Sequence, residues 1–391
     1  MFIIFLVTFI GLMGFGIILP LFPFYAERLG ASPEIITLTM SVFSLGQFFA
    51  APFWGRISDS IGRKKVLIIS LFGSGLSYVM LAYAETLTMV IISRVFAGLM
   101  AGNISIAFAY VSDITDPENR SAGLGKVSAA LGLGFMTGPA IGGFFAGSDV
   151  ENANYFLTAL VGAGINFIAM IATMMFLKES LKPEKRKSFE GVLNIIEADT
   201  FRPKKAILVL VSCGLIFYCA MSLMEAIFPL WANKIFDYGP SHIGAVFFML
   251  GSIAVIIQGG LIGRLTKLFG EKRLVQIAAT SVMIGLTLIG SAVNPVMLWG
   301  GLFFYGSGAA MFNPSLSSMV SKSAKENERG QFLGQYQAAC AMGRIIGPTF
   351  SGVLYSNFAP STPLYAGVII AIPVIFLIAN FTLRKPEGVI E

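Results

Sequence analysis

Charged side chains are scarce in this sequence. Only 12% of its 391 residues are Asp, Glu, Lys or Arg, whereas 55% are hydrophobic. Water-soluble domains carry about 25% charged residues, so the composition excludes a soluble globular protein. Because roughly 20 apolar residues cross a bilayer as a helix, the length suits about twelve crossings with short loops. The composition therefore predicts an all-α polytopic membrane protein.

Residues that serve catalysis and metal binding are also few. The sequence has a single histidine, His242, and three cysteines, Cys213, Cys219 and Cys340, in apolar stretches. They cannot form a metal-ligand cluster or a Ser/His/Asp set, and no phosphate-binding loop of the Gly-x-x-x-x-Gly-Lys-Ser/Thr type is present. We therefore expect neither an enzyme nor a cofactor. A nucleic-acid partner is not expected either, because no soluble domain concentrates positive charge.

The few charges separate long apolar stretches. Two of these stretches are too long for one crossing, and turns at Asn294-Pro295 and in 356–363 divide them. The predicted membrane helices are twelve in number: 2–26, 35–55, 66–84, 87–111, 123–147, 154–177, 206–231, 239–262, 274–292, 296–320, 331–355 and 363–383.

Basic residues are sorted to one side of these helices. Arg28 and Lys234 fall on the other side, and Arg94 and Arg344 lie within helices; all other lysines and arginines share one side. Short loops rich in lysine and arginine face the cytoplasm. Both termini are therefore predicted to be cytoplasmic, and the net charge of +6 reflects membrane topology.

The two halves of the chain repeat a pattern at an offset of about 208 residues. The repeat predicts two pseudo-symmetric six-helix bundles, 1–177 and 206–391. They are joined by a cytoplasmic linker, 178–205, in which a short surface helix is expected around 188–198. The repeated residues include Gly55, Gly62 and Lys64 with Gly263, Gly270 and Lys272, and Gly134, Gly138 and Pro139 with Gly343, Gly347 and Pro348.

Several motifs resemble those of the major facilitator superfamily. The segment 55–65 (GRISDSIGRKK) is similar to its loop signature between helices two and three, with Ser60 where arginine is usual. The helix-five segment 134–143 (GFMTGPAIGG) resembles a signature of the drug:proton antiporter branch, and Arg94-x-x-x-Gly98 is similar to a third motif. The opening segment 14–23 and Asp113 to Asp116 also resemble tetracycline and multidrug exporters.

This resemblance implies a monomeric secondary transporter in a bacterial plasma (inner) membrane. It would export amphipathic, often cationic, small molecules by alternating access, driven by the proton gradient without a cofactor. Its partners would be substrate, protons and the lipid bilayer. Tetracycline exporters carry acids in helices one and three, where this chain has Gly11 and Ser77, and multidrug relatives often carry one in helix ten. The missing acids count against tetracycline specificity.

The motifs predict two conformational devices. In the resembled family the loop-motif aspartate, here Asp59, bonds the N-terminus of helix eleven and latches the cytoplasmic side; a charged turn that only sets topology is the alternative. The helix-five glycines share one face and would line the interface between the halves, or simply pack closely. The latch residues are Gly55, Asp59, Gly62, Arg63, Lys64, Asp113 and Arg120, and the interface motif is Gly134, Gly138, Pro139, Gly142 and Gly143.

Three charges lie within predicted spans. Each costs about 2.5–3.5 kcal/mol to insert, so such residues usually face a cavity or a partner. Desolvation favours the neutral carboxyl form of Glu225, which a proton carrier needs; an acid that reaches the interface is the alternative. Arg94 matches a family position that assists proton transfer. Both Arg94 and Arg344 also fit structural ion pairing, and together they could clamp an anionic substrate.

Aromatic and amide side chains supply candidates for a substrate cavity. Aromatic residues suit promiscuous apolar binding, although each could instead face lipid and each amide could pin two helices. We expect a proton-coupled exporter of cations; the alternatives are a transporter of organic anions or lipid-like metabolites, and a sensor that binds without translocating. The cavity candidates are Phe15, Phe43, Gln47, Asn103, Tyr218, Phe228, Phe247, Phe304, Asn313, Gln337 and Arg344.

Overall fold

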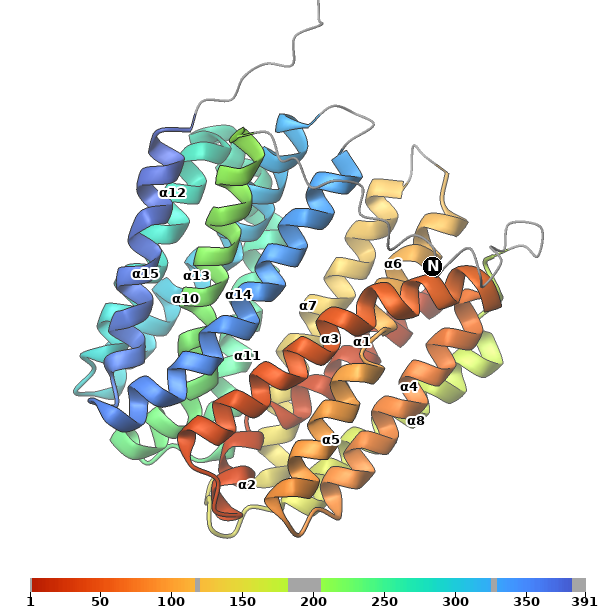
Figure 1. Ribbon diagram of the computed structural model, residues 1–391, viewed down its shortest axis with the longest axis horizontal. Coiled ribbons are helices and arrows are strands. Elements are labelled where there is room, and N and C mark those ends of the chain that lie inside the picture. Colours follow the sequence, from red (N-terminus) through yellow and green to blue (C-terminus); the bar gives the residue numbers. More distant parts are fainter. Residues whose placement is uncertain (1, 117–119, 182–204, 325–328, 382–391) are drawn as a thin grey trace, which may run out of the picture. The chain divides into compact units, whose positions relative to one another are not determined.

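The computed structural model describes residues 2–116, 120–181, 205–324 and 329–381, and all regular elements in this part of the chain are helices (Figure 1). The expected surface helix at 188–198 lies outside the described residues. The helices of the N-terminal half are α1 (Phe2–Ile18), α2 (Phe22–Arg28), α3 (Pro33–Ile61), α4 (Arg63–Ala82), α5 (Leu87–Met100), α6 (Asn103–Ile114), α7 (Arg120–Ala146) and α8 (Tyr155–Phe176). Those of the C-terminal half are α10 (Lys205–Phe236), α11 (Pro240–Ile256), the π-helix η3 (Ile257–Leu261), α12 (Ile262–Gly290), α13 (Pro295–Ser323), α14 (Arg329–Asn357) and α15 (Thr362–Ala379).

The described helices form the twelve membrane segments that the sequence predicts. Nine stretches of this part of the chain are long and apolar enough to cross a membrane, and one of them, Pro240–Gly290, has 51 residues and makes two segments. The 29-residue helices α13 and α14 complete the set. Short breaks at 19–21 and 101–102 divide the first and fourth segments into α1 with α2 and α5 with α6.

Helices continue well beyond the apolar spans. The motif at 55–65, expected as a loop, is helical as far as Ile61, and α4 begins again at Arg63. The single break is Gly62, whose φ of 105° is a left-handed conformation that glycine adopts readily. Gly270, its equivalent in the repeat, has φ 73° and breaks α12 in the same way. Charges therefore mark the edge of the membrane here and do not mark the end of the helix.

Contacts gather the chain into two compact units. Of the described residues, the first contains 2–31, 42–116, 120–181 and Asp237–Gly251, and the second contains Ser32–Ser41, 205–236, 252–324 and 329–381. The beginning of α3 therefore belongs with the second unit, and the beginning of α11 with the first. The predicted domains 1–177 and 206–391 stay a prediction about how the chain is organised.

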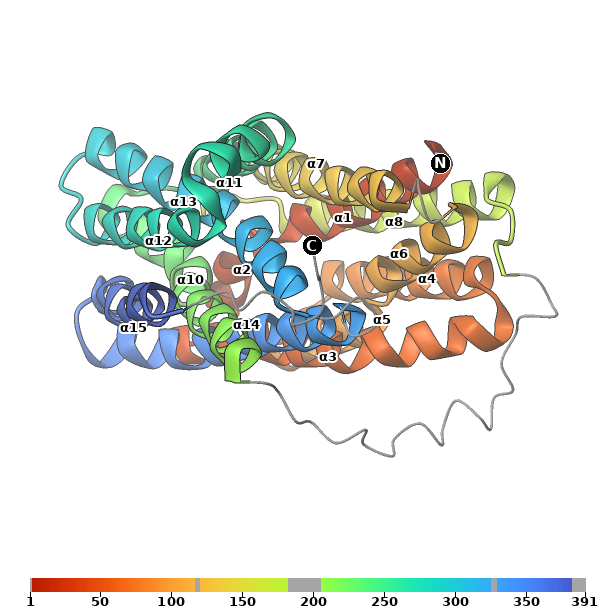
Figure 2. The same ribbon diagram turned by 90° about the horizontal axis from the view of Figure 1, so that it is seen from above.

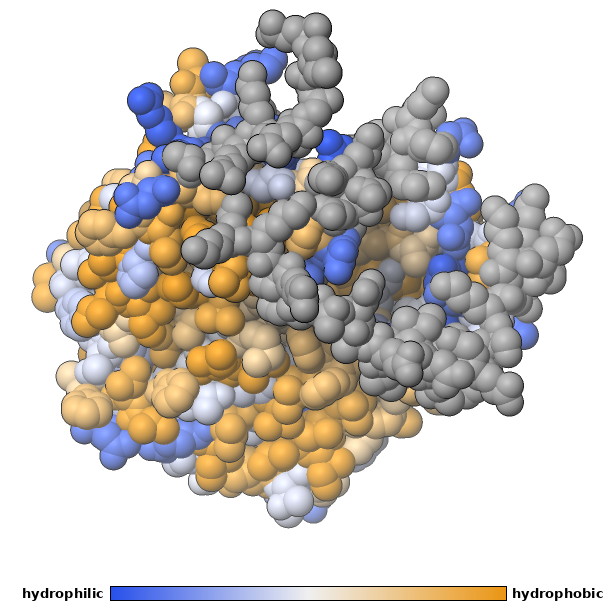
Figure 3. Space-filling view, turned by 45° about the horizontal axis from the view of Figure 1, so that its top comes forward, coloured by the Kyte–Doolittle hydropathy of each residue, from blue (hydrophilic) through white to orange (hydrophobic). Residues whose placement is uncertain are grey.

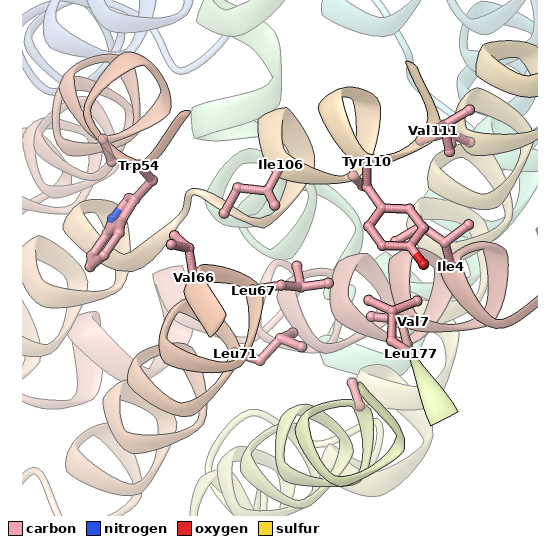
Figure 4. Packing of buried hydrophobic residues seen from close by; sticks show 14 residues of the cluster. Ile4, Val7, Trp54, Val66, Leu67, Leu71, Ile106, Tyr110, Val111 and Leu177 are labelled. Carbon is pink, nitrogen blue, oxygen red and sulfur yellow. The ribbon is translucent and has the colours of Figure 1, made fainter. Parts of the chain in front are cut away.

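A hydrophobic cluster fills the first unit near one end of its helices (Figure 4). Leu67 and Leu71 of α4 and Ile106 of α6 are fully buried there, and Trp54 of α3 covers the margin. The indole nitrogen of Trp54 donates to the carbonyl oxygen of Leu99 at 2.7 Å. This bond lets a partly polar ring lie in an apolar core without an unmade hydrogen bond.

Each unit is built from long helix pairs. In the first unit α1 packs on α7 and α8, and α4 packs on α8. In the second unit α10 packs on α14 and α15, and α12 packs on α13; both views place these pairs side by side (Figures 1 and 2). Large apolar side chains such as Phe49, Phe144 and Phe376 remain exposed, and hydrophobic residues dominate a broad face of the surface (Figure 3). Such a surface is expected where lipid is the solvent.

Candidate functional site

Glu225 lies in the middle of α10 and is held by a tyrosine of α13. The hydroxyl of Tyr305 donates to Oε1 of Glu225 at 3.2 Å, and the same hydroxyl lies 3.4 Å from the carbonyl oxygen of Met221. Tyr305 is only 1% exposed, whereas Glu225 is half-buried. A hydroxyl has one proton, so it can serve only one of these two acceptors at a time.

Arg344 of α14 contacts a tyrosine that lies on the same helix as Glu225. Its guanidinium carbon lies 4.6 Å from the ring centroid of Tyr218, which is a cation–π contact. The Arg344 side chain is exposed and makes no direct ion pair with Glu225 among the described residues. Tyr218 and Glu225 are seven residues apart on α10 and so share a face of the helix. We call Glu225, Tyr305, Tyr218 and Arg344, all in the second unit, the Glu225 cluster.

Arg94 of α5 lies in the first unit and is buried, with 6% of its surface exposed. Its guanidinium carbon lies 5.2 Å from the ring centroid of Tyr78, and its Nε is 3.4 Å from the hydroxyl oxygen of Ser93. Its Nη2 has no hydrogen-bond partner among the described residues. A buried cation with an unused donor is costly, and an anion or a polar ligand at Nη2 would lower that cost.

The aromatic cavity candidates fall into different surroundings. Phe15 and Phe43 stack on each other with centroids 5.3 Å apart in the first unit. Phe228 is fully buried in the second unit, and Phe247 packs edge-on to Phe135. Phe304 is 41% exposed on the surface between α12 and α13. The structure therefore does not bring these rings together into one described pocket, and their role at a cavity stays a prediction.

The polar candidates also differ in their contacts. Asn313 accepts a hydrogen bond of 2.8 Å from the hydroxyl of Tyr336 and so joins α13 to α14. Asn103 lies beside a small cavity next to α1 and α4. Gln47 is half-buried and Gln337 is exposed. Asn313 therefore makes the contact expected of an amide that holds two helices together, which is the alternative to a role in a substrate cavity.

Arg63 organises the latch motif at the beginning of α4. Its guanidinium lies 2.6 Å from Asp59 and 3.0 Å from Asp113, and it donates to the hydroxyl of Ser58 at 2.5 Å. The carboxylate of Glu179 accepts from the backbone nitrogens of Arg63 and its neighbour, at 2.9 and 3.2 Å. An anion at a helix N-terminus is stabilising. A bond between Asp59 and helix eleven stays a prediction, and the side chain of Arg120 lies outside the described residues.

The repeat of the latch motif uses the opposite polarity. Glu271, at the position equivalent to Arg63, pairs with Lys322 near the end of α13 and accepts from the hydroxyl of Ser318 at 3.1 Å. In the first unit the cation is on α4 and the anion, Asp113, is near the end of α6. In the second unit these signs are exchanged. Each unit thus joins the same two helix ends by an ion pair.

The repeated lysine has one role in both units. Nζ of Lys64 donates to the carbonyl oxygen of Met174 near the end of α8, at 2.8 Å. Nζ of Lys272 donates to the carbonyl oxygens of Ala379 and Phe381 at the end of α15, both at 2.8 Å. A lysine at these positions satisfies the free carbonyl groups of a helix C-terminus. The lysine of the Gly-x-Lys repeat therefore connects α4 to α8 in the first unit and α12 to α15 in the second.

Exchanging the charges of the Glu271–Lys322 pair tests whether the pairing itself matters. We expect Glu271→Lys alone and Lys322→Glu alone to lower the free energy of unfolding by about 1 kcal/mol, the upper end of the range for exposed pairs, because the Glu271 side chain is only 14% exposed. The double variant should recover most of this loss, because it restores opposite charges. Unfolding temperatures of the purified variants in detergent measure it, and a double variant less stable than both single variants would contradict the pairing.

The helix-five glycines face α1 within the first unit. At Gly138 an added Cβ would lie 2.5 Å from the carbonyl oxygen of Met13, and Gly134 and Gly142 meet α1 backbone in the same way. Pro139 contributes its ring to this contact. Small residues allow such close backbone approach between membrane helices. These contacts are close packing within one unit, and a role at the interface between the halves stays a prediction.

One further glycine of each repeat meets the beginning of a different helix. A Cβ on Gly143 would lie 2.7 Å from the carbonyl oxygen of Pro240 at the beginning of α11, in the first unit. A Cβ on Gly352 would lie 2.5 Å from the carbonyl oxygen of Pro33 at the beginning of α3, in the second unit. Equivalent glycines of the two halves thus make equivalent contacts, so the internal repeat of the sequence is also present in the packing.

Sequence reasoning missed two tyrosines, Tyr305 beside Glu225 and Tyr78 beneath Arg94. Neither carries a charge, so neither shows an insertion cost that would attract notice. A weak signal exists for Tyr305, since it is the only tyrosine in the glycine-rich stretch of α13. No group of three or more His, Cys, Asp or Glu residues that could hold a metal ion occurs in the described part of the chain.

Twelve membrane segments in two repeated sets, with ionisable residues held inside the spans of the described chain, define a polytopic membrane transporter. The fold is not that of a soluble enzyme, and the protein is an integral membrane protein. The chain belongs to the Major Facilitator Superfamily, whose family model matches residues 4–284 and 259–389.

Curated relatives of this chain include bacterial resistance proteins. It is 29% identical to multidrug resistance protein 2 of Bacillus subtilis over 372 residues, covering 93% of this chain and 90% of the relative. It is 26% identical to the class H tetracycline resistance protein of Pasteurella multocida over 359 residues, covering 90% and 88%. Transporters of this superfamily carry small molecules and coupling ions across the bilayer.

Solved structures share the fold. The human organic anion transporter MFSD10 (TETRAN) aligns with a TM-score of 0.73 at 23% identity, over 96% of this chain and 98% of that one. A mutant of the nucleoside transporter NupG aligns with a TM-score of 0.79 at 15% identity, over 97% and 99%. These likenesses establish the architecture.

Proposed function

We propose that this transporter exports amphipathic cations in exchange for protons, with Glu225 as the proton carrier. The observation that carries the proposal is the half-buried Glu225 carboxylate inside an apolar helix, held by a tyrosine and without a direct ion-pair partner among the described residues. A carboxylate that is permanently paired would have no reason to change protonation. The names of the curated relatives, multidrug and tetracycline resistance proteins, support export of drug-like molecules.

The Tyr305 hydroxyl suits both protonation states of Glu225. When the carboxylate is ionised, Tyr305 donates its proton to Oε1. When Glu225 is protonated, its own O–H can donate to the tyrosine oxygen, and Tyr305 can then donate to the carbonyl oxygen of Met221. A small rotation of two O–H groups exchanges the arrangements, so neither state leaves a buried polar group unpaired.

The charges around Glu225 match an exchange of one cation for another. An ionised Glu225 attracts either a proton or a cationic substrate, and occupancy by one disfavours the other. Tyr218, two helical turns before Glu225 on α10, already has a cation, the guanidinium of Arg344, over its ring. Arg94 would assist proton transfer, as the family position that its motif resembles implies. Within the first unit, the stacked rings of Phe15 and Phe43 would provide apolar surface for a substrate.

The cellular setting of the proposal follows the sorting of basic residues. Both termini would lie in the cytoplasm, and the protein would work as a monomer in a bacterial inner membrane. The proton gradient would supply the driving force without a cofactor. The Arg63 and Glu271 ion pairs would stabilise the basic ends of the two sets of helices during alternating access.

Transport of organic anions is a second candidate, and the arginines favour it. The Arg344 side chain is exposed, and Nη2 of Arg94 has no partner among the described residues. A guanidinium group matches carboxylate and phosphate geometry well.

Flux into proteoliposomes with an imposed pH gradient tests the proposal. We expect pH-gradient-driven transport of lipophilic cations, and no comparable transport of organic anions of similar size. A protonophore, which collapses the gradient, should abolish accumulation of the cations. Transport of anions alone would overturn the proposal in favour of the arginine-based function, and binding without flux would identify a sensor.

A further inference from the structure

A surface groove of about 580 Å³ runs along α12 and α13 in the second unit, and no residue of the Glu225 cluster lines it. Its size lies in the range of small-molecule sites, about 300–1,000 Å³. Of its lining residues only Phe304 is a candidate for the substrate cavity, and no step of the proposed transport cycle uses the groove. Its lining residues are Arg273, Gln276, Ile277, Thr280, Ser281, Ile284 and Phe304.

Arg273 is the one uncommitted charge in a row of three. Glu271 pairs with Lys322, and Lys272 caps the end of α15. Arg273 is exposed and makes no hydrogen bond or ion pair with any described residue. Its guanidinium group therefore remains available to a ligand at the end of the groove, next to the Gly270 break where a new helical segment begins.

The groove is polar at this end and apolar at the other. Gln276 lies one turn from Arg273, and like Thr280 its side chain makes no hydrogen bond within the described chain. Ile284 and the 41% exposed ring of Phe304 provide apolar walls further along. Unpaired polar groups are unusual on a surface that faces lipid, because nothing in hydrocarbon satisfies them.

The length of the groove corresponds to one leaflet. Positions 273, 277, 280 and 284 share a face of the helix, since residues three and four apart lie above one another. At 1.5 Å per residue the distance from Arg273 to Ile284 along the helix is about 16 Å. The hydrocarbon core of a bilayer is about 30 Å thick, so the groove extends from one membrane surface to about its middle.

We propose that this groove binds one anionic phospholipid. Arg273 would hold the phosphate, because a guanidinium group donates two parallel hydrogen bonds to phosphate oxygens. Gln276 and Thr280 would bond the glycerol ester oxygens just below. One acyl chain would lie along Ile277, Ile284 and Phe304. The basic end of the helices is also where anionic lipid headgroups are attracted.

Native mass spectrometry of the full-length protein in detergent tests the site. The probes are dioleoyl phosphatidylglycerol and dioleoyl phosphatidylcholine, which differ only in the headgroup. We expect the wild-type protein to retain phosphatidylglycerol in preference, and Arg273→Gln to bind it about fivefold more weakly, as expected for one basic residue near anionic lipid. Arg264→Gln is the matched control, since Arg264 is exposed at the same end and does not line the groove.

A second variant tests the apolar part of the groove. Thr280→Phe leaves the charge unchanged and fills the space beside Ile284, so it should reduce the binding of both lipids. Thr280 is exposed, so this change should not disturb the fold. Equal phosphatidylglycerol binding by wild type, Arg273→Gln and Thr280→Phe would overturn the proposal. A wild-type protein that forms dimers without bound lipid, together with a monomeric Thr280→Phe variant, would also overturn the proposal. That result would assign the groove to a second copy of the chain.

Discussion

Glu225→Gln should abolish proton-driven transport and leave exchange of substrate for substrate in place. The amide has the shape of a protonated carboxyl and can accept from Tyr305, so the packing of α10 against α13 is kept. It cannot bind and release a proton in each transport cycle, so the imposed pH gradient cannot drive net substrate flux. We expect gradient-driven accumulation in proteoliposomes to fall to background, with exchange between labelled and unlabelled substrate still measurable.

The matched control for this variant is Glu151→Gln. Glu151 lies exposed in the connection between α7 and α8, so its loss removes a carboxylate without touching the spans. It should transport like the wild type. Gradient-driven, substrate-dependent proton movement that survives in Glu225→Gln would remove Glu225 as the carrier. Loss of exchange as well as of driven flux would show that Glu225 is needed for movement between states.

Arg94→Met should make the protein more stable and stop it from transporting. Arg94 is 6% exposed, lies over an aromatic ring, and has an unused donor among the described residues. Methionine has a similar length and no charge to desolvate, so the folded state gains what the buried cation cost. The scale is about 2.5–3.5 kcal/mol for a charge within a membrane helix, which corresponds to a rise of several degrees in the unfolding temperature.

The combination of the two measurements identifies the role of Arg94. If Arg94 is kept for function despite its cost to stability, Arg94→Met should be more stable than the wild type and should transport at no more than a small fraction of the wild-type rate. If Arg94 instead pins its surroundings together, Arg94→Met should unfold at a lower temperature. Arg344→Met provides the comparison, because Arg344 is exposed and Arg94 is buried, so removing the charge of Arg344 should raise stability less.

Much of the fold could be predicted from the sequence because membrane insertion leaves a strong composition signal. The twelve segments were found from the spacing of charges. The extents of the helices were not, because a helix does not stop where hydrocarbon ends. The charged segment before Ile61 is helical, and the turn is the single residue Gly62. Positive φ at Gly62 and Gly270 is a backbone property that hydropathy does not report.

The candidate site could be predicted only where a residue is costly in a membrane. Glu225, Arg94 and Arg344 stand out for this reason, and the structure gives each of them an aromatic neighbour. Tyr305 could not be found in this way, because a tyrosine costs little to insert and its hydroxyl matters only when a partner is near. The reversed polarity of the Glu271–Lys322 pair could not be predicted for a different reason. The two halves repeat the same glycines, whereas the charged residues at equivalent positions have opposite signs.

The exchange of a proton for a cation at Glu225 can be measured most directly as proton release on substrate binding. Purified protein in a weakly buffered detergent solution receives a lipophilic cation, and a pH indicator follows the free proton concentration. The wild type should release protons in proportion to the substrate bound. Glu225→Gln should bind the cation more weakly, because the carboxylate charge is lost, and should release no protons. Equal proton release from both proteins, or binding by the wild type with no release, would contradict the role of Glu225.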